Sequence, residues 1–110
     1  MEDAALYLPR GLMAEDIRRR AALVRAVVFD VDGTLTDGRI YYFEWGGRGV
    51  AFFSQDGHGI ASLVAAGFKV AWVTANYGSV IEGRASKLGV HLVLCRIADK
   101  EEAIGLALAD

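Results

Sequence analysis

Several features that mark other protein classes are scarce in this sequence. A single cysteine, Cys95, excludes an internal disulfide framework, and a single proline, Pro9, lies in a break near the start of the chain. Charges such as Arg25, Asp30 and Asp32 interrupt the hydrophobic runs well short of the ~20 apolar residues that a transmembrane helix needs. The net charge of −2 provides no basic surface for nucleic acid.

These absences favour a protein of the reducing cytoplasm that neither spans a membrane nor binds nucleic acid. The chain opens with Glu2 and Asp3 rather than with the basic region of a secretory signal. Cys95 ends the apolar run 91–95, so we expect a buried small hydrophobe there rather than a reactive thiol.

Hydrophobic residues are abundant instead. They make up 54% of the 110 residues and the mean hydropathy is +0.29. This length is enough for one small domain with a core of its own. We therefore expect either a sheet covered on both faces or a surface that is buried against another chain.

The stretch 27–38 organises the chain. It begins with Val27, Val28 and Phe29, a pattern typical of a strand buried on both faces of a parallel sheet, for which we predict residues 25–30. Asp30 and Asp32 follow at the carboxyl end of this strand. Open α/β sheets bind their ligands outside the carboxyl ends of strands, so both carboxylates are candidate site residues.

Two neighbouring carboxylates repel each other unless a cation or a proton lies between them. Mg²⁺, which prefers oxygen ligands, fits such a pair. One carboxylate can then attack phosphorus and the other can transfer protons. Gly33 and Thr34 can direct backbone N–H groups at an anion. The alternative is a strand that ends in two solvated aspartates, but the apolar strand before them and the Gly-Thr after them favour a site.

The stretch from Val28 to Gly38 resembles the first motif of the haloacid dehalogenase superfamily of phosphohydrolases. Its continuation into an aromatic hairpin is similar to the 3-deoxy-D-manno-octulosonate 8-phosphate phosphatase branch. That branch also includes phosphatases of nonulosonic (sialic-acid-like) sugar phosphates and a domain of some acylneuraminate cytidylyltransferases. The resemblance implies a three-layer, Rossmann-like α/β fold with a parallel sheet and an inserted hairpin flap. It also implies bound Mg²⁺, with Asp30 as nucleophile and metal ligand and Asp32 as general acid/base whose carbonyl joins the metal.

The flap is expected at about residues 38–54. Two aromatic and β-branched runs, 40–45 and 48–53, flank Gly46-Gly47, which predicts a β-hairpin with its turn at the two glycines. In the resembling family this flap packs between the subunits of a tetramer. An aromatic stacking site for a base or a sugar is the alternative.

Further motifs follow in the family's order. The pattern Asp-Gly-x-Gly-Ile at 56–60 opens a predicted helix that runs to about residue 66, with Asp56 as its cap and His58 as a loop residue near the pocket. The next strand, 69–74, ends in Thr74, which matches the family's phosphate-binding second motif. Ala75-Asn76 then stands where the branch usually has Gly-Arg, and both residues are candidates for phosphate or substrate binding.

Helices are predicted at 13–23, 79–88 (closed by Gly89) and 101–108, and a third strand at 90–95. Lys100 matches the third-motif lysine that steadies the nucleophile and the phosphate. The resemblance covers roughly residues 13–105, but the fourth motif, an acidic Gly-Asp-Asp-x-x-Asp cluster, is absent. The 110 residues thus read as one domain, equivalent to about the first two-thirds of a family domain, and apparently truncated at the C-terminus.

Two functions remain open from the sequence. The first is a Mg²⁺-dependent phosphomonoesterase that acts on a small sugar-acid phosphate through an aspartyl-phosphate at Asp30. The second is a non-catalytic module that keeps the fold for oligomerisation or to support a synthetase. A fragment, a truncated gene product and a shortened homologue are all compatible with the missing motif.

The missing strand also predicts an open sheet edge at residues 27–29. No proline or inward charge blunts pairing there. We expect that another chain or a further segment completes the sheet and that the 110 residues do not persist as a free monomer.

Overall fold

The computed structural model describes residues 14–109. Its centre is a parallel sheet of three strands in the order β1-β4-β5, with β1 at Ala26–Asp30, β4 at Lys69–Val73 and β5 at Leu92–Leu94. Ala26 pairs with Lys69 and Asp30 with Val73, so the carboxyl ends of β1 and β4 lie at the same edge. The first strand and its successors are confirmed, although β5 is shorter than the predicted 90–95.

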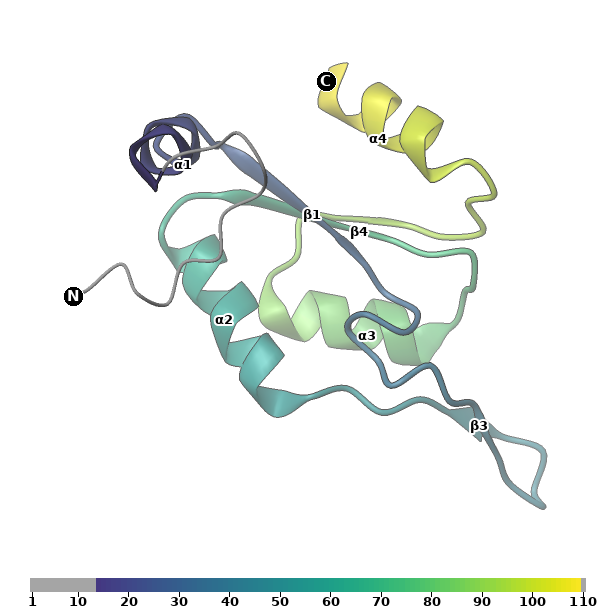
Figure 1. Cartoon of the computed structure of the whole chain (residues 1–110). Coiled ribbons are helices and arrows are strands. Elements are labelled where there is room, and N and C mark those ends of the chain that lie inside the picture. The colour runs from purple at the N-terminus through teal and green to yellow at the C-terminus, as the bar shows by residue number, and fades with distance from the viewer. Residues whose placement is uncertain (1–13, 110) are drawn as a thin grey trace.

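Four helices pack around this sheet, as expected for parallel strands joined by helical crossovers. They are α1 (Ala14–Ala21), α2 (Ser54–Ala65), α3 (Ser79–Leu88) and α4 (Lys100–Ala109). In Figure 1, α2 and α3 lie on one side of the sheet and α1 and α4 on the other. The three-layer α/β prediction is confirmed. No helix within residues 14–109 is long and apolar enough to cross a membrane.

The helix ends were predicted with mixed success. Gly89 closes α3 in the left-handed conformation (φ 84°), and its N–H donates to the carbonyl of Ser86. The predicted cap at Asp56 was wrong, because α2 begins at Ser54 and Phe53 occupies the cap position without a side-chain hydrogen bond. Asp56 lies in the first turn, where its charge favours the positive end of the helix dipole.

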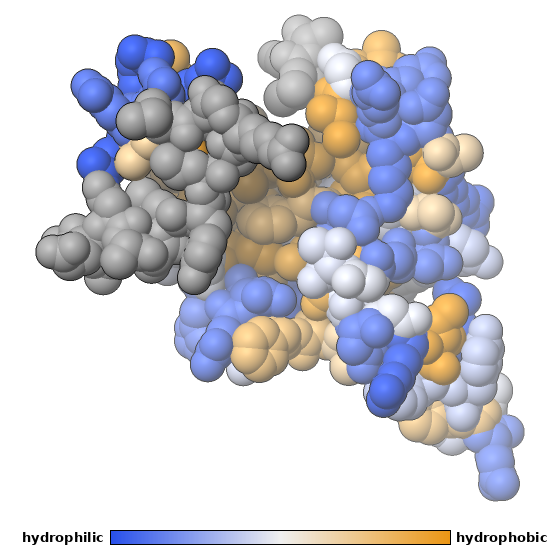
Figure 2. Space-filling view, in the orientation of Figure 1, coloured by the Kyte–Doolittle hydropathy of each residue, from blue (hydrophilic) through white to orange (hydrophobic). Residues whose placement is uncertain are grey.

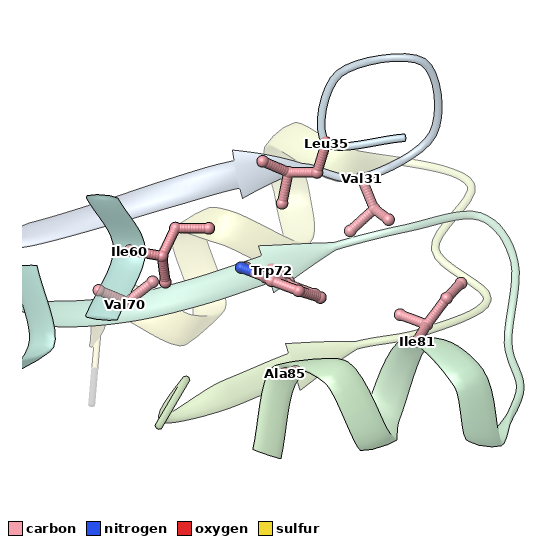
Figure 3. Packing of buried hydrophobic residues seen from close by; sticks show 7 residues of the cluster. All are labelled: Val31, Leu35, Ile60, Val70, Trp72, Ile81 and Ala85. Atoms are coloured by element: carbon pink, nitrogen blue, oxygen red, sulfur yellow. The ribbon is translucent and has the colours of Figure 1, made fainter. Parts of the chain in front are cut away.

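The core lies between β4 and the two helices α2 and α3. Val70 and Trp72 are two residues apart on β4, so their side chains share the face that packs on these helices. Figure 3 shows them among neighbouring hydrophobic side chains. The fully buried cluster comprises Val31, Leu35, Ile60, Val70, Trp72, Ile81 and Ala85. Val31 and Leu35 belong to the loop after β1, so the core itself holds the loop that carries Asp32.

The predicted hairpin exists, but its paired strands are only two residues long. They are β2 (Tyr41–Tyr42) and β3 (Arg48–Gly49), and a bridge between Thr36 and Phe52 closes the base. The turn does not centre on the two glycines as predicted. The N–H of Gly46 donates to the carbonyl of Phe43, and Gly46 has φ 93°, which is a three-residue loop that ends in a left-handed glycine.

Aromatic side chains of the hairpin remain exposed. Trp45 is 78% exposed and stacks on Phe43 with 5.4 Å between ring centroids, and Tyr42 and Phe53 are also exposed. The hairpin projects away from the sheet (Figure 1). Only Phe52 at its base packs against the core, where it stacks on Trp72, and the aromatic side chains nearer the tip are available to contact another surface.

β1 is an edge strand among the described residues, as predicted, because it pairs with β4 alone. All five of its residues are half-buried rather than buried. Figure 2 shows hydrophobic surface recessed in the middle of one face, where β1 runs in Figure 1.

Candidate active site

The candidate site lies where β1 and β4 end. Asp30 is the last residue of β1, Asp32 lies two residues further on, and Thr74 follows β4. Between the aspartates, the buried Val31 uses its carbonyl to accept N–H groups of Thr34 and Leu35 at 3.2 and 2.9 Å. This tight loop fixes both carboxylates at one edge of the sheet.

Asp30 forms an ion pair with Lys100, the first residue of α4. Its second carboxylate oxygen accepts a hydrogen bond from the Thr34 hydroxyl at 3.1 Å. The hydrogen bond from Lys100 lowers the pKa of Asp30 below its usual value, and the Thr34 hydroxyl adds to the effect. Asp30 is thus kept ionised, the state a nucleophile requires.

Asp32 has a different set of partners. Its Oδ2 accepts the Thr74 hydroxyl at 2.5 Å and its Oδ1 accepts Nδ2 of Asn76 at 2.8 Å. The N–H of Asn76 in turn donates to Oγ1 of Thr74 at 3.0 Å. Thr74 is fully buried, so this network holds Asp32 in one orientation.

The backbone N–H groups of Gly33 and Thr34, which were predicted to bind an anion, have partners within the loop. The N–H of Gly33 donates to the Thr36 hydroxyl at 3.1 Å, and the N–H of Thr34 donates to Val31. Neither N–H is therefore directed at an anion, because the loop uses both to fold on itself. Ala75 is exposed beside Asn76.

The oxygens of Asp30 and Asp32 suit a hard cation such as Mg²⁺ in their chemistry. They are carboxylates that follow one strand end, and the backbone carbonyl of Asp32 belongs to the same loop. Within residues 14–109, however, no group of three His, Cys, Asp or Glu side chains gathers to hold a metal. These residues fit part of a magnesium site.

A cleft of about 440 Å³ opens next to Asp32. The flap forms one wall and the loop between β4 and α3, with the first turn of α3, forms the other. The lining residues are Asp32, Thr36, Gly38, Arg39, Ile40, Trp45, Gly47, Arg48, Gly49, Val50, Asn76, Tyr77, Gly78, Ser79, Val80 and Ile81.

Tyr77 joins three segments at the rim of this cleft. Arg48 of the flap donates from Nη2 to the Tyr77 carbonyl at 3.2 Å, and its guanidinium carbon lies 5.7 Å from the Tyr77 ring centroid. The guanidinium carbon of Arg96, from the loop after β5, lies 4.1 Å from the same centroid. Both distances are within the range of cation–π attraction.

Known proteins match this chain in sequence. The 3-deoxy-D-manno-octulosonate 8-phosphate phosphatase of Yersinia pestis is 40% identical over 83 residues, which is 74% of this chain and 44% of that protein. The chain is a homologue of these phosphatases. It spans about half the length of the curated relatives that it matches. No family model matches the chain.

Solved structures agree with this relationship. The crystal structure of the Yersinia pestis enzyme superposes with a TM-score of 0.81 at 36% identity, covering 88% of this chain and 52% of that one. The Moraxella catarrhalis enzyme, solved with magnesium, phosphate and its sugar acid, gives a TM-score of 0.79 at 31% identity, covering 88% and 56%. The fold is that of the haloacid dehalogenase superfamily over the elements present.

Some predictions about single residues need correction. His58 lies within α2 rather than in a loop, it is exposed, and it does not line the cleft. Cys95 is half-buried, and burial, reinforced by the charge of Glu82, raises the pKa of its thiol.

Three residues at the rim of the cleft were not predicted from the sequence, because they match no motif and meet only through the tertiary fold. They are Arg48, Tyr77 and Arg96.

Proposed function

We propose that this chain is the catalytic part of a phosphomonoesterase that hydrolyses the phosphate ester of a small sugar acid. One observation carries the proposal: Asp30, paired with Lys100, lies two residues before Asp32 at the carboxyl edge of a parallel sheet. A nucleophile, a cation and a second carboxyl group are thereby placed around a single point.

In the proposed reaction an oxygen of Asp30 attacks phosphorus and forms an aspartyl-phosphate. The ester P–O bond breaks, and its oxygen takes a proton from the carboxyl group of Asp32. Asp32 then accepts a proton from water, whose oxygen attacks phosphorus. The bond to Asp30 breaks, inorganic phosphate leaves and Asp30 is regenerated.

The surrounding residues support these roles. Lys100 neutralises Asp30 and lies where it can also balance phosphate charge. Thr74 and Asn76 orient Asp32, so we assign them positioning roles, in addition to the phosphate contacts expected from the sequence. Gly33, Thr34 and Ala75 border the site and complete the proposed phosphate-binding set.

Mg²⁺ is the proposed cofactor, since a related structure was solved with a magnesium ion. The carboxylate of Asp30 and the backbone carbonyl of Asp32 would hold it. When bound, it would neutralise charge on the phosphate. The described residues supply no third acidic side chain, so we expect weak metal binding by these residues alone.

The cleft and the relatives support the proposed substrate class. The volume of the cleft is within the ~300–1,000 Å³ usual for small-molecule sites. The relatives are named for 3-deoxy-D-manno-octulosonate 8-phosphate, and we propose this compound or a nonulosonate 9-phosphate as substrate. We further propose one domain with a flap at 38–54, a tetramer formed through the flap and a location in the cytoplasm.

The test is hydrolysis of p-nitrophenyl phosphate and of 3-deoxy-D-manno-octulosonate 8-phosphate, with and without Mg²⁺. Asp30→Asn should abolish turnover of both, whereas Arg25→Gln, a change at the residue before β1 and at the opposite end of the strand from Asp30, should not. Equal turnover by the wild type and Asp30→Asn would remove Asp30 as the nucleophile. A stable multimer without any phosphatase activity would instead favour the non-catalytic module.

A further inference from the structure

The cleft beside Asp32 is lined by charged side chains of both signs. They are Asp32 and, from the flap, Arg39 and Arg48. Within residues 14–109 neither arginine forms an ion pair with a carboxylate. Arg96 contacts the same Tyr77 ring as Arg48 and also lacks such a partner among these residues. The cleft therefore holds two arginines and one aspartate, and among residues 14–109 no carboxylate forms an ion pair with either arginine.

Arg48 is exposed, but its guanidinium has two contacts with Tyr77. Its guanidinium donates to the Tyr77 carbonyl and rests near the Tyr77 ring, so part of its conformational entropy is already lost. A guanidinium has five N–H donors, and one hydrogen bond to a carbonyl leaves most of them available. This is the arrangement that binds a carboxylate through two parallel hydrogen bonds at little further cost.

Arg96 is the second arginine in contact with the Tyr77 ring. It is the one residue other than glycine within 14–109 with a positive φ (58°), a conformation that costs free energy for an L-residue. Its N–H donates to the carbonyl of Asn76 at 3.1 Å, and its guanidinium covers the Tyr77 ring. Tyr77 is thus fixed between the flap and the loop that leads to Lys100.

We propose that Arg48, held on Tyr77, binds the carboxylate of the substrate at the part of the cleft away from Asp32. The inference rests on the proposed function, which assigns the phosphate to Asp30 and Lys100. The sugar then spans the cleft, and Arg39 and the amino end of α3 add positive potential on the two walls. Arg48 determines specificity for sugar acids over uncharged sugars, and Tyr77 and Arg96 are its positioning residues.

The first experiment compares two substrates with Arg48→Gln. Loss of a charged hydrogen bond should lower kcat/KM for 3-deoxy-D-manno-octulosonate 8-phosphate by about 10–100-fold. Turnover of p-nitrophenyl phosphate, which has no carboxylate, should stay within about twofold. Arg25→Gln, with the same charge change outside the cleft, is the matched control. An equal loss for both substrates, or no loss for either, overturns the subsite.

A second pair of variants tests whether the Tyr77 ring positions Arg48. Tyr77→Leu should raise KM for the sugar-acid phosphate with little change in kcat, because the ring that orients Arg48 is lost. Tyr77→Phe keeps the ring and the backbone carbonyl and should restore the wild-type KM. If Tyr77→Phe is as impaired as Tyr77→Leu, the ring does not position Arg48.

Binding without turnover separates this inference from the proposed function. Calorimetry with the free sugar acid, 3-deoxy-D-manno-octulosonate, should show affinity that Arg48→Gln weakens about tenfold or more, even if the chain hydrolyses no phosphate ester. Normal hydrolysis by Arg48→Gln would refute the subsite and leave the phosphatase standing. Absence of sugar-acid binding and of hydrolysis in the wild type overturns both.

Discussion

Asp30 and Asp32 are separated by one residue, yet their surroundings prepare them for different tasks. A cation and a hydroxyl hold Asp30, whereas only uncharged donors, Thr74 and Asn76, hold Asp32. An ion pair favours the charged carboxylate that a nucleophile needs.

Replacing Lys100 tests this assignment through acid–base behaviour. In Lys100→Gln the pKa of Asp30 should rise toward its usual value, because the hydrogen bond that lowers it is lost. NMR titration of the Asp30 carboxyl carbon measures the change. Arg19→Gln, which removes the ion pair with Asp16 on α1, should leave the Asp30 titration unaltered.

Lys100→Gln should also lower the free energy of unfolding near neutral pH. A carboxylate whose pKa is lowered on folding stabilises the fold above its unfolded pKa and loses that contribution as pH falls through the folded value. Both side chains of the pair are 38% exposed, so we expect at most about 1 kcal/mol at pH 7. The difference between wild type and variant in urea unfolding should shrink as pH falls below the usual aspartate pKa of 3.8, and it should vanish once the pH is below the lowered pKa of folded Asp30. A difference that grows in acid would contradict this.

The site residues were predictable from sequence to different degrees. Asp30, Asp32, Thr74 and Lys100 could be proposed because they match the motifs of the resembling family in sequence order, next to strand ends or at a helix start. Their partners could not be assigned, since the bond from Asn76 to Asp32 joins segments 44 residues apart. The contact of Arg48 with Tyr77 depends on how the flap folds back, which no local pattern encodes.

Among the secondary-structure elements, α3 was predicted to its ends and the hairpin was not. Gly89 is a strong stop signal because the left-handed cap favours glycine. In the hairpin, two adjacent glycines are compatible with more than one turn type, so the sequence did not determine where the turn lies. The chain uses Gly46 as the left-handed residue of a three-residue loop. The start of α2 was misplaced because its cap position is Phe53, a residue that gives no capping signal.

Two glycines of α3 give a matched pair of substitutions. Gly89→Ala should destabilise the protein by about 1–2 kcal/mol, because its φ is 84° and the new Cβ would lie 3.2 Å from Val64. Gly83→Ala, in the helix interior with open space around it, should stabilise it by about 0.5–1 kcal/mol. Urea unfolding checks both values. Similar effects of the two changes would mean that the left-handed cap is not needed.

For the whole molecule, the order β1-β4-β5 leaves β1 without a neighbour on one side among the described residues. Exposed N–H and C=O groups along an apolar strand favour pairing with another strand. We expect the purified 110-residue chain to associate rather than remain monomeric. Sedimentation velocity at micromolar concentration measures this, and a well-folded monomer would disprove it.

The flap offers a second surface for assembly. If its aromatic residues pack between subunits, Trp45→Glu should lower the mass measured by light scattering, while Trp45→Phe should keep it. Circular dichroism should be unchanged in both, because Trp45 is 78% exposed and outside the core. Trp45 also lines the cleft, so an unchanged mass with weaker sugar binding would support the stacking alternative instead.

The strand order has a consequence for how the chain folds. β4, α3 and β5 are consecutive, so their contacts close short loops, whereas residues 31–68 separate β1 from its partner β4. Closing the longer loop costs more entropy and gives a higher contact order. We expect the unit from β4 to β5 to form first and β1 to join it afterwards. The two aspartates would then be the last part of the site to arrive, so a refolding chain would acquire its helices before its catalytic geometry.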